Sequence, residues 1–142
     1  MASINTGKVI TGGLLAGVVM NVCDMVWNFT VMQADMTAMA QKFGIDPAVA
    51  MSFSGALPFI IADFILGLVV VWNYAAIRPR FGPGPKTALL AGAVPYIAVT
   101  AVLYGFSSLG MMSNSTMVKG SITALITMAL GSLAGAWAYK EA

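Results

Sequence analysis

The chain has 142 residues, of which 59% are hydrophobic and only 8% are charged, whereas a soluble domain carries about 25% charged residues to cover its surface. The length allows one domain, and the mean hydropathy of +0.88 predicts that this domain lies in lipid. The net charge of +2 is too small for a protein that binds nucleic acid. The absence of His and the single cysteine, Cys23, exclude imidazole catalysis, the common zinc sites and a disulfide within the chain.

Four stretches are long and apolar enough to cross a membrane, since a helical span needs about 20 residues at a rise of about 1.5 Å each. They run roughly over 8–32, 55–77, 86–107 and 116–139. We therefore expect an all-α fold in which residues 1–142 form one antiparallel bundle of four transmembrane helices. The first stretch differs from a cleaved signal peptide, because its apolar run exceeds the usual length of about 7–15 residues.

The first span has a polar stripe on one face and bulky apolar residues on the other. The stripe of small and polar side chains lies within one narrow arc and consists of Gly13, Gly17, Asn21, Asp24 and Asn28. In lipid, small and polar residues face other helices and bulky residues face acyl chains. Cys23 lies off the stripe and is expected to be a small buried apolar residue.

The connection between the first two spans is predicted to contain a short helix. Gly44 is typical of a helix end, and Asp46-Pro47 is typical of an N-cap followed by proline in the first turn. Met32, Met36 and Met39 recur at helical spacing, which favours an amphipathic helix on the membrane surface. Together with Met111, Met112 and Met117 they would suit Cu(I), although flexible apolar packing is the usual role of methionine.

The connection from Arg78 to Lys86 contains three prolines and two glycines, so we expect it to be non-helical. Its three cations, Arg78, Arg80 and Lys86, are candidates for binding anionic lipid headgroups or a partner subunit. The simpler interpretation is that they only set the topology of the chain.

The remaining spans each have one face of small residues that predicts close packing. The glycines expected at helix contacts in the second, third and fourth spans are Gly67, Gly92, Gly131 and Gly135. The face of the second span that carries Gly67 also carries Asp63 and Tyr74.

The distribution of cations predicts the orientation of the bundle. Five cations fall on the side of the termini: Lys8, Arg78, Arg80, Lys86 and Lys140. Only Lys42 and Lys119 fall on the other side, so we expect both termini in the cytoplasm. The same side holds the aromatic residues expected at the interface, which are Trp72, Tyr74, Trp137 and Tyr139.

Asp24 and Asp63 are the leading candidate site, because an ionisable group at the centre of a span costs roughly 2.5–3.5 kcal/mol. Both lie about nine residues from the end of their span, so we expect them at equal depth on neighbouring helices. They could bind protons or a cation together with Asn21 and Asn28. The favoured interpretation is structural, with hydrogen bonds to neighbouring helices.

Three segments resemble a group of small bacterial four-span inner-membrane proteins without an assigned function. They are KVITGGLLAG at 8–17, AAIRPRFGPGPKTA at 75–88 after Tyr74, and AGAWAYK at 134–140. The resemblance implies a multi-pass protein of the bacterial inner membrane. It implies no catalytic residue and no cofactor.

Composition and pattern together favour a protein that is not an enzyme and binds neither a metal nor a cofactor. We expect an accessory or structural subunit of a larger or homo-oligomeric membrane assembly, with membrane lipid, other membrane subunits or its own copies as partners. The alternative is a small oligomeric transporter or channel that uses Asp24 and Asp63.

Overall fold

The structure, a computed structural model, describes residues 4–139, which form six helices and no strand. The helices are α1 (Thr6–Thr30), α2 (Gln33–Lys42), α3 (Pro47–Ala50), α4 (Phe53–Phe81), α5 (Pro85–Ser108) and α6 (Asn114–Ala138). Of these, α1, α4, α5 and α6 are long and apolar enough to cross a membrane. The predicted all-α fold with four spans is confirmed. Lys140, which entered the prediction of orientation, lies outside the described residues.

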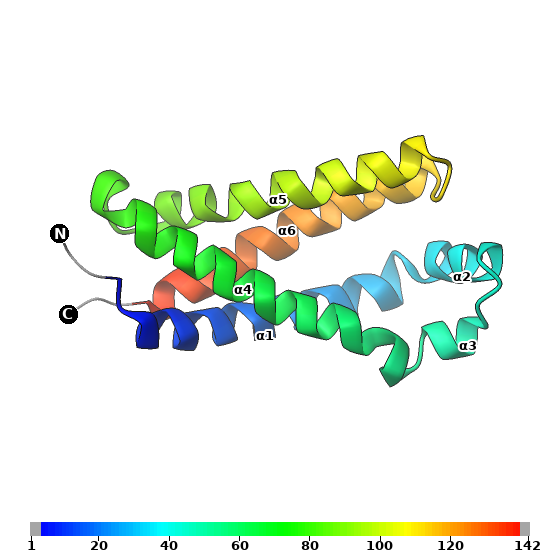
Figure 1. The fold of residues 1–142 in the computed structure, drawn as a ribbon, viewed down its shortest axis with the longest axis horizontal. Helices are drawn as coiled ribbons and strands as arrows, with labels where there is room; N and C mark the ends of the chain where they lie inside the picture. Colours follow the sequence, from blue (N-terminus) through cyan, green and yellow to red (C-terminus); the bar gives the residue numbers. More distant parts are fainter. Residues whose placement is uncertain (1–3, 140–142) are drawn as a thin grey trace.

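The four long helices form a bundle in which α1 and α5 each pack against both α4 and α6 (Figure 1). The start of α1 and the end of α6 lie at one end of the bundle, which we call the termini end. The short helices lie at the opposite end, which we call the α2–α3 end. There α5 and α6 diverge from α4. In the view of Figure 1, α2 lies between α4 on one side and the pair of α5 and α6 on the other.

The predicted helix boundaries between the first two spans are confirmed by local chemistry. Gly44 follows α2 with a φ of 68°, a left-handed conformation that glycine adopts without a steric penalty. The side chain of Asp46 accepts a hydrogen bond from the backbone N–H of Ala48 at 2.9 Å, and Pro47 is the first residue of α3. The connection therefore holds two short helices, where the sequence predicted one.

The expectation that residues 78–86 are non-helical is wrong at both ends. Helix α4 continues through Arg78, Pro79 and Arg80, because a proline in the last turns removes only one backbone donor. Helix α5 begins at Pro85, where the missing N–H has no helical partner to lose. The turn is therefore reduced to residues 82–84, and the N–H of Gly84 donates to the hydroxyl of Tyr74 at 3.2 Å.

The predicted small-residue faces are the faces on which the helices meet. Gly13, Gly17, Gly67, Gly92, Gly131 and Gly135 are all buried. A Cβ added to Gly13 would lie 2.8 Å from the Cα of Leu68, and one added to Gly17 would lie 2.8 Å from the Cα of Phe64. These distances are shorter than van der Waals contact, so α1 and α4 approach closely only because both positions are glycine.

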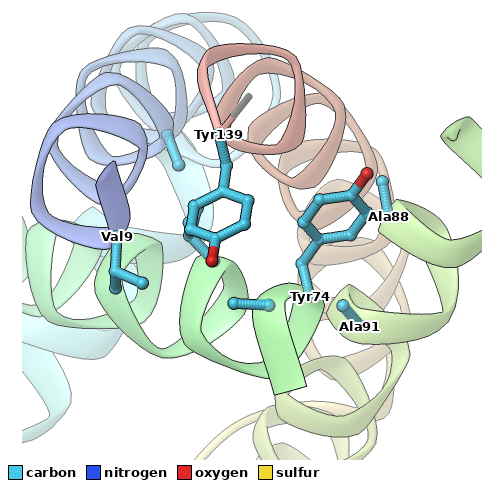
Figure 2. Packing of buried hydrophobic residues seen from close by; sticks show 8 residues of the cluster. Val9, Tyr74, Ala88, Ala91 and Tyr139 are labelled. Atoms are coloured by element: carbon cyan, nitrogen blue, oxygen red, sulfur yellow. The ribbon is translucent and has the colours of Figure 1, made fainter. Parts of the chain in front are cut away.

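Tyr74 and Tyr139 are buried inside the bundle, which corrects their predicted place at the membrane interface. Tyr139 is 2% exposed and Tyr74 is 4% exposed, while Trp72 and Trp137 remain exposed. The two tyrosine rings meet edge to face with centroids 6.0 Å apart, near Ala88 and Ala91 of α5 (Figure 2). The hydroxyl groups explain this burial, because each accepts a hydrogen bond from the backbone, at Gly84 and Asn5 respectively.

The close approach of α1 and α4 predicts that alanine destabilises the protein at Gly17 but not at Gly105, where there is open space. Gly17→Ala should destabilise the protein by about 1–3 kcal/mol, because the added methyl group forces the helices apart. Gly105→Ala is the control, since a Cβ at this position of α5 meets nothing within 4 Å, and loss of a helical glycine stabilises by about 0.5–1 kcal/mol. The melting temperatures of both variants in detergent test this, and equal melting would contradict close packing at Gly17.

Candidate functional site

A cavity of about 570 Å³ lies between α1 and α4 at the α2–α3 end of the bundle. It is lined by one face of α1 and one face of α4, by Met36 of α2 and by Ala50 of α3. Its polar lining residues are Asn21, Asp24, Asn28, Ser52 and Asp63. The four polar residues that the sequence singled out on the first two spans therefore line one cavity.

Asp24 and Asp63 do not lie at equal depth, contrary to our expectation. Gly13 meets Leu68, Gly17 meets Phe64, and the amide of Asn21 reaches the carbonyl of Ile60, so each step along α1 matches an equal step back along α4. This register places Asp63 level with Val18. Asp24 lies six residues beyond Val18, about 9 Å further along the helix axis. The glycine contacts set the register of α1 and α4, and distances from the span ends do not predict it.

Two of the polar residues join α1 to its neighbours. The amide nitrogen of Asn21 donates to the carbonyl oxygens of Gly17 at 2.9 Å and of Ile60 at 3.3 Å. The hydroxyl of Thr127 in α6 donates to Oδ1 of Asp24 at 2.8 Å. Asn21 thus links α1 to α4 and Asp24 links α1 to α6, which is the structural role that the sequence favoured.

Asp63 differs from these residues because it has no such bond. It is only 7% exposed, its side chain lines the cavity, and no hydrogen bond to it is found within residues 4–139. Asn28 is exposed and lines the same cavity. Cys23 is partly exposed, so its predicted burial is wrong; it lies off the face that carries the glycines.

The three cations of the 78–86 region have different surroundings. The guanidinium of Arg78, a partly exposed residue, lies 6.0 Å from the centre of the Tyr139 ring. Arg80 lies 5.9 Å from the ring of Phe81 and is exposed, as is Lys86. Arg78 therefore contributes to the packing at the termini end, whereas Arg80 and Lys86 are exposed.

An ion pair between α2 and α6 was missed by the sequence analysis, which used Lys119 only to predict topology. The ammonium of Lys119 and the hydroxyl of Thr116 each donate to Asp35 at 2.7 Å. These two bonds lower the pKa of Asp35, with that from Lys119 contributing most. The pair fixes α2 against α6, and the ammonium of Lys42 adds a hydrogen bond to the carbonyl of Gly110.

The methionines of the two predicted groups meet beside this ion pair. Met39 of α2 and Met111 and Met112 of the α5–α6 connection line a second cavity of about 230 Å³. Asp35 and Lys42 line it as well. Flexible apolar packing, the usual role of methionine, accounts for their place here.

No family model, curated protein or solved structure matches this chain. The four membrane-capable helices indicate a multi-pass membrane protein. The cavity between α1 and α4 and the packing at the termini end are the features from which its function can be inferred.

The ion pair of Asp35 predicts a pH-dependent stability. The folded protein lowers the pKa of Asp35. The ion pair therefore contributes fully to the free energy of unfolding above the unfolded pKa of about 3.9, and this contribution is lost as the pH falls through the folded pKa. Asp35→Ala should cost less than about 1 kcal/mol at pH 7, since Lys119 is 41% exposed. The difference in melting temperature from the wild type should shrink below about pH 4. A difference that is constant from pH 7 to pH 3 would contradict this role.

Proposed function

We propose that this membrane protein is an accessory or structural subunit of a larger membrane assembly, or of an assembly of its own copies. The observation that carries the proposal is the close packing of the termini end. There a Cβ on Gly12 would lie 2.8 Å from the carbonyl oxygen of Gly135, and the side chains of Tyr74 and Tyr139 fill the space between the helices. A solute in the cavity at the α2–α3 end would meet this packed half of the bundle.

The second candidate is an oligomeric transporter or channel. Its support is the cavity itself, because both Asp24 and Asp63 line it and carboxylates in a span are typical of proton or cation pathways. A path across the membrane would have to form between copies of the chain, since the packed half lies within one copy. The first proposal requires no such path.

The two proposals differ in the behaviour of the purified chain. The accessory role predicts that a pull-down in mild detergent recovers a stoichiometric complex with other membrane subunits, whereas the transporter predicts copies of the chain alone. Liposomes that contain the chain alone should then show no proton or cation flux above that of empty liposomes. Flux that Asp63→Asn abolishes, with an unchanged melting temperature, would favour the transporter and overturn the accessory role.

We also propose that the protein lies in a bacterial inner membrane with both termini in the cytoplasm. Four of the six Lys and Arg residues within 4–139 belong to segments at the termini end, namely Lys8, Arg78, Arg80 and Lys86. An excess of cations on one side is typical of the cytoplasmic side. The resemblance of segment 75–88 to small bacterial four-span proteins agrees with this location.

The orientation predicts which of two exposed positions can be labelled from outside the cell. In a background where Cys23 is replaced by Ser, Ser115→Cys should react with an impermeant thiol reagent added to intact cells. Pro83→Cys, in the turn at the termini end, should react only after the cells are lysed. The opposite pattern would show that the bundle is inverted.

A further inference from the structure

The cavity between α1 and α4 combines an acidic part with walls of aromatic and aliphatic side chains. Four phenylalanines line it, namely Phe29, Phe53, Phe59 and Phe64. Its volume of about 570 Å³ lies in the range of about 300–1,000 Å³ that is typical of small-molecule sites. A ligand that fits must therefore have an apolar body and a polar group that is complementary to carboxylates.

Asp63 indicates what that polar group is. Its side chain is buried, lines the cavity and has no hydrogen-bond partner within residues 4–139. A carboxyl group buried in lipid without a partner is costly, so a bound group that neutralises it would be favoured. Asp24 lines the same cavity, and the bond from Thr127 occupies its Oδ1. Both acids therefore favour a positively charged ligand.

The walls indicate an organic cation and disfavour a metal ion. The described residues contain no group of three or more His, Cys, Asp or Glu that could hold a metal. An inorganic ion would also lose part of its hydration shell to the phenylalanine and valine side chains that line the rest of the cavity. A delocalised or alkylated cation loses less hydration, and its charge is attracted to the faces of aromatic rings.

The rim of the cavity indicates how such a ligand arrives. Lining residues on both helices are more than half exposed, including Phe29 at 61%, Phe53 at 75% and Phe59 at 64%. In a bilayer these side chains face acyl chains, so the cavity is accessible from the lipid. A cation that reaches it from there must itself partition into lipid.

We propose that this cavity binds an amphipathic organic cation, with the charge beside Asp63 and Asp24 and the apolar body against the phenylalanines. Two shapes share this chemistry: a compact aromatic cation and a quaternary ammonium on a single alkyl chain. Binding does not require transport, so this site goes beyond the proposed accessory role and does not depend on it.

The test measures binding of tetraphenylphosphonium and of dodecyltrimethylammonium to the full chain in phosphatidylcholine nanodiscs by equilibrium dialysis. We expect saturable binding of one cation per chain, and the tighter of the two probes distinguishes the compact from the single-chain ligand. Tetraphenylborate, which has the same shape as tetraphenylphosphonium and the opposite charge, should not saturate the site. Failure of both cations to saturate, or equal binding of the borate, would overturn the proposal.

Three variants assign the binding to this cavity. Asp63→Asn should weaken binding at least tenfold. Asp46→Asn is the control and should leave binding unchanged, because asparagine keeps the N-cap of α3 and the charge that it removes lies outside the cavity. Phe59→Leu should weaken binding at least threefold, and since Phe59 is 64% exposed, this change leaves the packing of the bundle intact. Unchanged affinity in both Asp63→Asn and Phe59→Leu would overturn the proposal. A loss of affinity in Phe59→Leu supports the proposal even where Asp63→Asn fails to fold.

Discussion

The approach of α1 to both α4 and α6 is the contact on which the rest of this structure depends. Between helices in lipid there is no hydrophobic driving force, so association relies on van der Waals contact and interhelical hydrogen bonds. Gly13 and Gly17 provide the contact with α4, and Gly12 provides the contact with Gly135 of α6. Because α1 packs against two helices, it fixes the register of both.

One stripe of residues on α1 has two roles. Its glycines pack closely against α4, and its polar residues line the cavity. Along the stripe, Gly13 and Gly17 are followed by Asn21, Asp24 and Asn28, so the side chains become larger and more polar toward the α2–α3 end. Gly13 and Gly17 lie at the close contact with α4, and α1 and α4 separate toward α2 and α3 after they cross (Figure 1). The cavity is the space that results, and its polar lining is the continuation of the glycine stripe.

Much of the fold could be predicted because it depends on properties of single segments. Hydropathy located the four spans, and the local chemistry of Gly44 and Asp46 located two helix ends. The relative depth of Asp24 and Asp63 could not be predicted, since it depends on which residues of α1 and α4 touch. The burial of Tyr74 and Tyr139 was missed for a similar reason, because each hydroxyl finds its partner in a distant part of the chain.

The few acidic residues of the chain show why Asp63 is the most informative of them. Within residues 4–139 there are four acids, and three have a mechanical role: Asp46 caps α3, Asp35 holds α2 against α6, and Asp24 joins α1 to α6. The position of α2 also places Met36, the residue after Asp35, in the lining of the cavity. Asp63 is the exception, since the described residues offer its carboxyl group no hydrogen bond. The proposed cation would give this carboxyl group the partner that the described residues lack, in the cavity that Asp63 lines.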